Sequence, residues 1–147
     1  MLTISPFIST GSPNFPLGVS EEYFVKERNS TAQKVPALTW FKVRLIVNLI
    51  KMSIKLSFYY LQDVSSAGLL DVTANHTITW LKSKLKALKD IDSENILFYL
   101  DTGNTFHIPT YYKFDVPLDN PDLYRDYFVR HCMSEVPVIG VSGASSK

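Results

Sequence analysis

Apolar residues recur along the chain with helical spacing in some segments and with strand-like alternation in others. Between residues 38 and 62, apolar positions three and four apart, among them Trp40, Val47 and Ile54, predict one long helix. Residues 51–58 of this stretch also alternate between apolar and polar, which is typical of a strand. We expect the helix, and the paired-strand alternative stays open.

The clearest helical pattern runs from Ile78 to Lys89. Its apolar stripe consists of Ile78, Leu81, Leu85 and Leu88. A second face carries lysines at positions four and then three apart, with Lys84 nearby: Lys82, Lys86 and Lys89. The segment is therefore predicted to be an amphipathic helix with a basic face.

A β-hairpin is expected after this helix, with strands over residues 96–100 and 105–108. The turn between them is Asp101-Thr102-Gly103-Asn104, because Gly and Asn accept positive φ at little cost. Pro109 limits the return strand to a sheet edge or a strand end. A last helix is expected over residues 121–133, with proline in its first turn, and a short strand over residues 136–141.

The remaining segments define the predicted domain boundaries. Residues 1–36 are rich in Ser, Thr, Pro and Gly, which predicts an extended arm. Residues 37–141 form one globular domain, and residues 142–147 form a flexible tail. Within the domain, residues 63–68 are expected to be a turn and residues 69–72 a short strand.

Composition fits a single domain that can bury a core. The chain has 147 residues, 46% of them hydrophobic and 20% charged, with 15 basic and 14 acidic side chains. A strongly nucleic-acid-binding domain is usually more basic, so the clustering of lysines matters more than their number. The apolar stretch over residues 38–62 carries too many Lys and Arg residues to cross a bilayer, and we expect no membrane span.

Several kinds of chemistry are unsupported by the sequence. Cys132 is the only cysteine, which excludes an internal disulfide and a Cys-rich zinc site, and fits a reducing intracellular compartment such as host cytoplasm or a virion. The first 19 residues lack the pattern of a signal peptide. The three histidines share no ligand spacing, and no Gly-rich phosphate loop occurs. We therefore expect no cofactor and no metal.

Asp101-Thr102-Gly103 matches the triplet of aspartic proteases. Such enzymes need two carboxylates that share a proton, which a dimer of this chain could supply. Asn104 follows the glycine where a small residue is usual, and a charged helix is expected where further core strands should lie. Turn chemistry explains the triplet better, and a dimeric protease that uses Asp101 remains a remote alternative.

Three segments carry a resemblance to a known group. They are "LSFYYLQDVSSAGLLDV" (residues 56–72), "WLKSKLKALKDI" (residues 80–91) and "TGNTFHIPTYYKF" (residues 102–114). Together with "DNPDLYRDYFVRH" (residues 119–131), they resemble the winged-helix N-terminal domains of phage and mobile-element replication-organiser proteins. The resemblance implies an α+β winged-helix fold that binds duplex DNA through the Ile78 to Lys89 helix and the Asp101 to Asn104 hairpin tip. The chain departs from that group in leaving only residues 71–77 for the middle helix.

The leading functional expectation is a non-catalytic DNA-binding protein of viral or mobile-element type. Its contact residues would be Thr79, Lys82, Ser83, Lys86, Lys89, Thr102 and Asn104. The alternative is a structural or assembly subunit of a virion or a large complex, with a β-rich fold if residues 38–62 are paired strands. In both cases we expect protein partners or a homo-oligomer.

Overall fold

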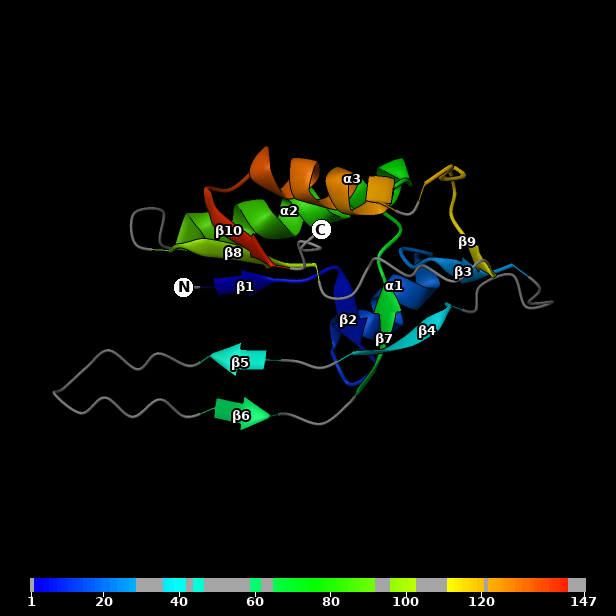
Figure 1. The fold of residues 1–147 in the computed structure, drawn as a ribbon, viewed down its shortest axis with the longest axis horizontal. Helices are drawn as coiled ribbons and strands as arrows, with labels where there is room; N and C mark the ends of the chain where they lie inside the picture. The colour runs from blue at the N-terminus through cyan, green and yellow to red at the C-terminus, as the bar shows by residue number, and fades with distance from the viewer. Residues whose placement is uncertain are drawn as a thin grey trace, which may run out of the picture.

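The structure, a computed structural model, describes residues 2–28, 36–41, 44–46, 59–61, 65–91, 96–102, 111–120 and 122–142. These residues form a mixed α+β fold (Figure 1). The helices are α1 (Asn14–Ser20), α2 (Asn75–Ile91) and α3 (Asp122–Met133). The strands are β1 (Leu2–Ile4), β2 (Phe7–Ser9), β3 (Lys26–Glu27), β4 (Leu38–Phe41), β5 (Arg44–Ile46), β6 (Tyr59–Leu61), β7 (Ser65–Leu69), β8 (Phe98–Asp101), β9 (Tyr112–Lys113) and β10 (Val138–Ser142).

One sheet is parallel and has the order β1-β8-β10, with β8 in the centre. Phe98 is the register partner of Leu2 on one side and of Val138 on the other. The pairing of β10 with β8 shifts by one residue between Val138 and Gly140. α2 leads into β8, and α3 lies between β8 and β10 in the chain. The parallel pairs thus follow the strand–helix–strand connection that parallel sheets require.

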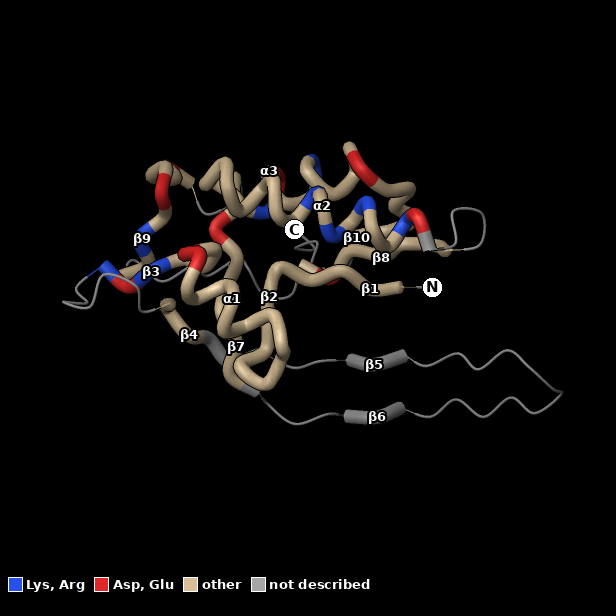
Figure 2. The backbone as a smooth tube through the Cα atoms, turned by 180° about the vertical axis from the view of Figure 1, so that it is seen from behind, with Lys and Arg blue, Asp and Glu red and all other residues tan. Residues whose placement is uncertain are grey.

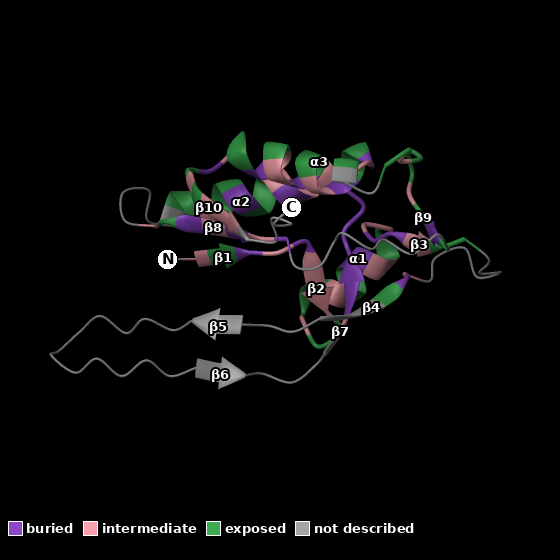
Figure 3. Ribbon diagram, in the orientation of Figure 1, coloured by how far each residue is buried: buried purple, intermediate pink, exposed green. Residues whose placement is uncertain are grey.

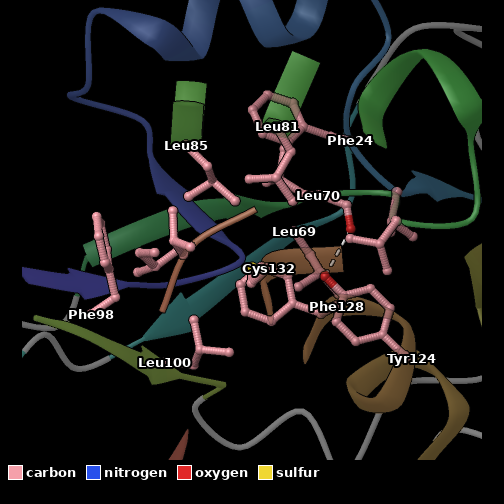
Figure 4. Packing of buried hydrophobic residues seen from close by; sticks show 14 of the residues in the cluster. Phe24, Leu69, Leu70, Leu81, Leu85, Phe98, Leu100, Tyr124, Phe128 and Cys132 are labelled. Atoms are coloured by element: carbon pink, nitrogen blue, oxygen red, sulfur yellow. Dashed lines mark hydrogen bonds between the residues drawn. The ribbon is translucent and has the colours of Figure 1, made fainter. Parts of the chain in front are cut away.

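One face of this parallel sheet makes the main core with α2 and α3. Strand and helix side chains share a single buried cluster, and the close-up shows β8 presenting two side chains to it, Phe98 and Leu100 (Figure 4). Leu85 of α2 and Phe128 of α3 join them, and both side chains are fully buried. Because both helices pack on the same buried strand side chains, both cover the same face of the sheet (Figures 1 and 3).

A second sheet is antiparallel, with the order β2-β7-β4. Its neighbour α1 presents a glycine, Gly18, to the ring of Phe24, and β7 presents Gly68 to the same ring. Phe15 stacks on Phe24 with ring centroids 5.0 Å apart. This region is therefore organised around one buried aromatic ring and the backbone that approaches it. Two further antiparallel pairs occur, β3 with β9 and β5 with β6.

The prediction of one long helix over residues 38–62 is wrong at every described position in that stretch. Residues 38–41, 44–46 and 59–61 are strands, and each pairs with another strand. The described residues include Trp40, Phe41, Ile46, Tyr59 and Tyr60, which are aromatic or β-branched and fit a pleated sheet. Cross-strand pairing therefore outweighed an apolar spacing that also matched a helix. The alternating stretch over residues 51–58 lies outside the described residues.

The strand expected to open the hairpin around Asp101 is present, but its observed partners are not those of a hairpin. Residues 98–100 form a strand, as expected, but both edges of β8 are occupied by parallel partners, β1 and β10. An antiparallel return strand has no free edge of β8 to join. The expected return strand over residues 105–108, with Gly103 and Asn104, lies outside the described residues.

The N-terminal segment is part of the folded core rather than an arm. Within residues 2–28, β1 joins the parallel sheet, and Phe24 and Val25 are buried. Residues 65–68, expected to be a turn, begin β7, since they pair with both β2 and β4. Both segments contain turn-forming residues, but both include strands because they pair with strands far away in the chain.

Other elements are confirmed. α2 contains the whole segment from Ile78 to Lys89, and Leu81 and Leu85 on its apolar stripe are buried. α3 covers residues 122–133, close to the expected helix, and β10 forms near the expected C-terminal strand. In the described part of the chain, no helix has the length and apolar character needed to cross a membrane.

Candidate functional site

The carboxyl ends of the parallel strands meet at one edge of their sheet. Asp101 is the last residue of the central strand β8, and its register partner is Ser142, the last residue of β10. Ile4 ends β1 at the same edge. In open parallel sheets, ligands bind outside the carboxyl ends of the strands at the point where the strand order reverses. The described order β1-β8-β10 does not reverse, so only the position of Asp101 at a strand end matches that rule. Asp101 therefore lies at the carboxyl end of the central strand of the described sheet.

The local sequence of β8 explains how Asp101 is presented. Side chains along a strand alternate between its two faces. Phe98 and Leu100 are buried against the helices, whereas Tyr99 and Asp101 are partly exposed on the other face. The apolar residues of β8 thus fix the strand in the core and leave the carboxylate at the edge, next to solvent.

Thr102 follows Asp101 and is buried, with 0% of its surface exposed. The expectation that it would contact DNA from an exposed hairpin tip does not fit this burial. Asn104, the other expected tip residue, lies outside the described residues. The hairpin tip of the DNA-binding hypothesis is therefore not assembled by the described part of the structure.

The expected basic face of α2 is present but partly neutralised. Lys82 forms an ion pair with Glu135, with Nζ and Oε1 2.9 Å apart. The hydrogen bond that Lys82 donates holds the pKa of Glu135 below its ordinary value. Lys86 and Lys89 are exposed, and blue segments mark the lysines along α2 in Figure 2. Lys86 and Lys89, two of the three lysines expected to contact phosphates, are thus open to solvent.

The two hydroxyl residues expected to reach bases donate hydrogen bonds to their own helix. Thr79 Oγ1 donates to the carbonyl of Asn75 at 2.9 Å, and Ser83 Oγ donates to the carbonyl of Trp80 at 2.7 Å. Such local bonds are the ordinary use of Ser and Thr on helices. Both side chains are exposed, so these bonds are compatible with contact but do not indicate it.

A second carboxylate, which the sequence reasoning missed, lies at the end of the β7 segment. Asp71 is 4% exposed, and its Oδ1 accepts hydrogen bonds from the backbone N–H and the hydroxyl of Thr73. Its Oδ2 accepts the N–H of Asp115 at 2.7 Å. The sequence signal for such a role is Asp two residues before Thr. Asp71 fixes the start of α2 to the segment before α3, which is a structural role.

Other titratable groups near the core are unsuited to chemistry. Burial raises the pKa of Cys132 to about 12, which leaves its thiol protonated and weakly nucleophilic. Burial lowers the pKa of His131, with Lys82 and Arg130 acting in the same direction. Among the described residues, no group of three His, Cys, Asp or Glu side chains is arranged to hold a metal ion.

The carboxyl edge and the basic face of α2 are thus the two candidate sites in the described structure. Comparison with known proteins favours neither, because no protein-family model and no curated protein sequence matches the chain.

Proposed function

We propose that the carboxyl edge of the β1-β8-β10 sheet is an enzyme site and that Asp101 is its reactive carboxylate. The observation that carries this proposal is the position of Asp101 at the carboxyl end of the central parallel strand, on the face opposite the helices. Parallel α/β folds place reactive groups at such strand ends. The proposal replaces the expectation of a protein without catalytic residues.

A carboxylate at this position supports hydrolysis or group transfer. An aspartate there can accept a proton from an attacking water, or attack the substrate as a nucleophile. Asp71, which lies just after β7, is only 4% exposed. Asp101 is partly exposed and is therefore the better candidate of these two for contact with a substrate.

The test is a measurement of initial rates on p-nitrophenyl esters, phosphates and glycosides. We expect turnover of one class, and Asp101→Asn should lower that rate by about 10²–10⁴-fold, the range for loss of a positioned acid or base. Asp126→Asn is the matched control, because Asp126 is exposed on α3. Equal rates for Asp101→Asn and wild type, or no turnover of any class, would overturn the proposal.

Nucleic-acid contact through α2 is a second candidate, and the exposure of Lys86 and Lys89 supports it. The winged-helix arrangement gains less support, because β1 and β10 occupy both edges of the strand that should carry the wing. Lys86→Glu combined with Lys89→Glu should weaken duplex binding and reduce its salt dependence. If affinity and salt slope stay unchanged in this variant, α2 is not a DNA-binding helix.

A further inference from the structure

Cations from two helices gather around one acid, Glu135, which lies just after α3. Nζ of Lys82, on α2, is 2.9 Å from Oε1 of Glu135. The pKa of Glu135 is lowered first by the hydrogen bond from this lysine, and the charge of Lys86 adds to the effect. Burial lowers the pKa of His131, and the charges of Lys82 and Arg130 act in the same direction. Because charges shift a pKa strongly only at short range, the lysines of α2 and the last turn of α3 form one cluster.

This cluster is part of a larger surface, the two-helix basic surface, which consists of Lys82, Lys86, Lys89, Arg130 and His131. The three lysines are four and three residues apart, so they lie on one face of α2. Lys86, Lys89 and Arg130 are exposed, and Figure 2 shows blue segments on both helices. In the part of the chain that the structure describes, no ion pair joins these three side chains to an acid. They are therefore open to an anionic partner, whereas Lys82 is engaged by Glu135.

The surroundings of the lysines favour nucleic acid over a membrane as that partner. A helix that lies on a membrane inserts large apolar side chains from the face opposite its cations. The apolar stripe of α2 is in the core instead, since Leu81 and Leu85 are buried. Clustered lysines and an arginine are the side chains that bind the phosphates of nucleic acids, and arginine can bind a phosphate with two hydrogen bonds.

From this arrangement we propose that the two-helix basic surface binds the phosphate backbone of duplex DNA and that Glu135 weakens this binding. A phosphate that reaches Lys82 must displace the carboxylate of Glu135, which forms the same kind of charged hydrogen bond. This inference rests on the second candidate function, contact through α2, and adds α3 and an internal competitor to it. It is independent of the reactive carboxylate proposed at Asp101.

The test is fluorescence anisotropy of a short labelled DNA duplex, titrated with the whole chain between about 50 and 200 mM salt. Arg130→Gln should weaken binding and reduce the salt slope by about 1, as for the loss of one phosphate contact. Arg28→Gln is the matched control, because Arg28 is an exposed arginine next to β3. Equal effects of the two substitutions would mean that only net charge matters, and would overturn the proposal.

Glu135→Gln tests the competitor, and its expected effect has the opposite sign. It removes the charge that engages Lys82 and keeps the size of the side chain, so affinity for the duplex should rise by about 2- to 5-fold, the factor for one partly exposed charge pair. Glu27→Gln makes the same change of charge at an exposed position on β3 and should raise affinity less. Unchanged or weaker binding by Glu135→Gln would overturn the role of Glu135.

The backbone amide shifts of the unmodified chain locate the surface without any substitution. Added duplex should shift the amides of Lys86, Arg130 and Glu135 together, and shifts confined to other residues would contradict the proposal. Vesicles of phosphatidylcholine with phosphatidylserine are the second probe. If they bind and the duplex does not, the partner is an anionic membrane and the proposal is wrong.

The outcomes separate this inference from the candidate function on which it rests. If Lys86→Glu combined with Lys89→Glu weakens duplex binding but Arg130→Gln and Glu135→Gln leave it unchanged, the contact is made by α2 alone. That result overturns the two-helix surface and keeps the second candidate function. If the unmodified chain binds no duplex at the lowest salt, both are overturned, whatever the rate assays on Asp101 show.

Discussion

The parallel layer and the antiparallel layer of this protein are stabilised in different ways. In the parallel layer, alternating side chains of β8 such as Phe98 and Leu100 meet two amphipathic helices, and the core consists of side chains on both sides. In the antiparallel layer, one ring, Phe24, contacts backbone at Gly18 and Gly68. The parallel layer should therefore lose most stability when a buried side chain is removed, and the antiparallel layer when a side chain is added at a glycine.

The two layers are joined by a buried hydrogen bond as well as by the shared core. Tyr124 of α3 donates its hydroxyl to the carbonyl of Leu70 at 2.8 Å (Figure 4). Burial raises the pKa of Tyr124 well above its ordinary value, with Asp71 and Cys132 adding to the effect. The phenol therefore stays protonated and remains a donor, which couples α3 to the chain that leaves β7.

The largest expected effect is in the parallel layer. Phe128→Ala removes a fully buried side chain of α3 from the shared core and should lower the free energy of unfolding by about 3–5 kcal/mol. Urea denaturation followed by circular dichroism measures the change. The exposed neighbour Tyr127→Ala is the control, and a similar loss in both variants would mean that the core is not where the structure places it.

A smaller but still large effect is expected in the antiparallel layer. Gly68→Ala places a Cβ 2.7 Å from Cδ1 and 2.9 Å from Cγ of Phe24. These two atoms lie at the end of the buried ring that is nearest its own backbone. The free energy of unfolding should fall by about 1–3 kcal/mol, the range for overpacking. Gly11→Ala serves as the control with open space. If Gly68→Ala is as stable as Gly11→Ala, the ring does not pack against backbone.

The link between the layers is expected to contribute less. Tyr124→Phe keeps the ring and removes the donor to Leu70, while the N–H of Val72 still reaches that carbonyl at 3.2 Å. The loss should be about 0.5–1.5 kcal/mol, as for one intramolecular hydrogen bond. Denaturation measured in parallel with Tyr127→Phe, whose ring is partly exposed, checks it. No difference between the two variants would remove this link from the account.

The smallest effect is the dependence of stability on pH. The folded-state pKa of His131 lies below 6.5, so the unfolded chain takes up this proton first and stability falls as the pH drops from 6.5 toward the folded value. The folded-state pKa of Glu135 lies below 4.5, so its contribution is present above 4.5 and is lost as the pH falls through the folded value.

Two variants separate these windows in urea denaturation from pH 7 down to about pH 2. His131→Gln should flatten the upper part of the curve, and Glu135→Gln the lower part. Added salt should reduce the second effect because the Lys82–Glu135 pair is partly exposed. A variant whose curve keeps the wild-type shape in its own window would contradict the shift of the residue that it replaces.

The sequence predicted the parallel layer better than the antiparallel one. α2 could be found because its apolar residues repeat with helical spacing, and α3 because a proline in the first turn marks its start. Strand pairing could not be found, since the partners of β8 are residues 2–4 and 138–142, at opposite ends of the chain. The rings of Phe24 and Tyr99 lie over distant glycines, and no local pattern marks such contacts.

The candidate site was visible in the sequence but was assigned the wrong surroundings. Asp101 was placed in a turn because Gly103 and Asn104 follow it, whereas the structure makes it the end of a central parallel strand. The strands over residues 38–41, 44–46 and 59–61 also lie where the winged-helix interpretation needed a helix. Size-exclusion chromatography with light scattering would show whether copies of the chain associate.

The most direct test of the central claim is chemical rescue of Asp101→Ala by formate, a small carboxylate that can occupy the vacated position. On the p-nitrophenyl substrate that wild type turns over, Asp101→Ala should be slowed by about 10²–10⁴-fold. Added formate should restore part of the rate in this variant and leave the wild-type rate unchanged. A folded Asp101→Ala protein with the wild-type rate, or one that formate does not accelerate, would contradict a reactive carboxylate at the edge of the parallel sheet.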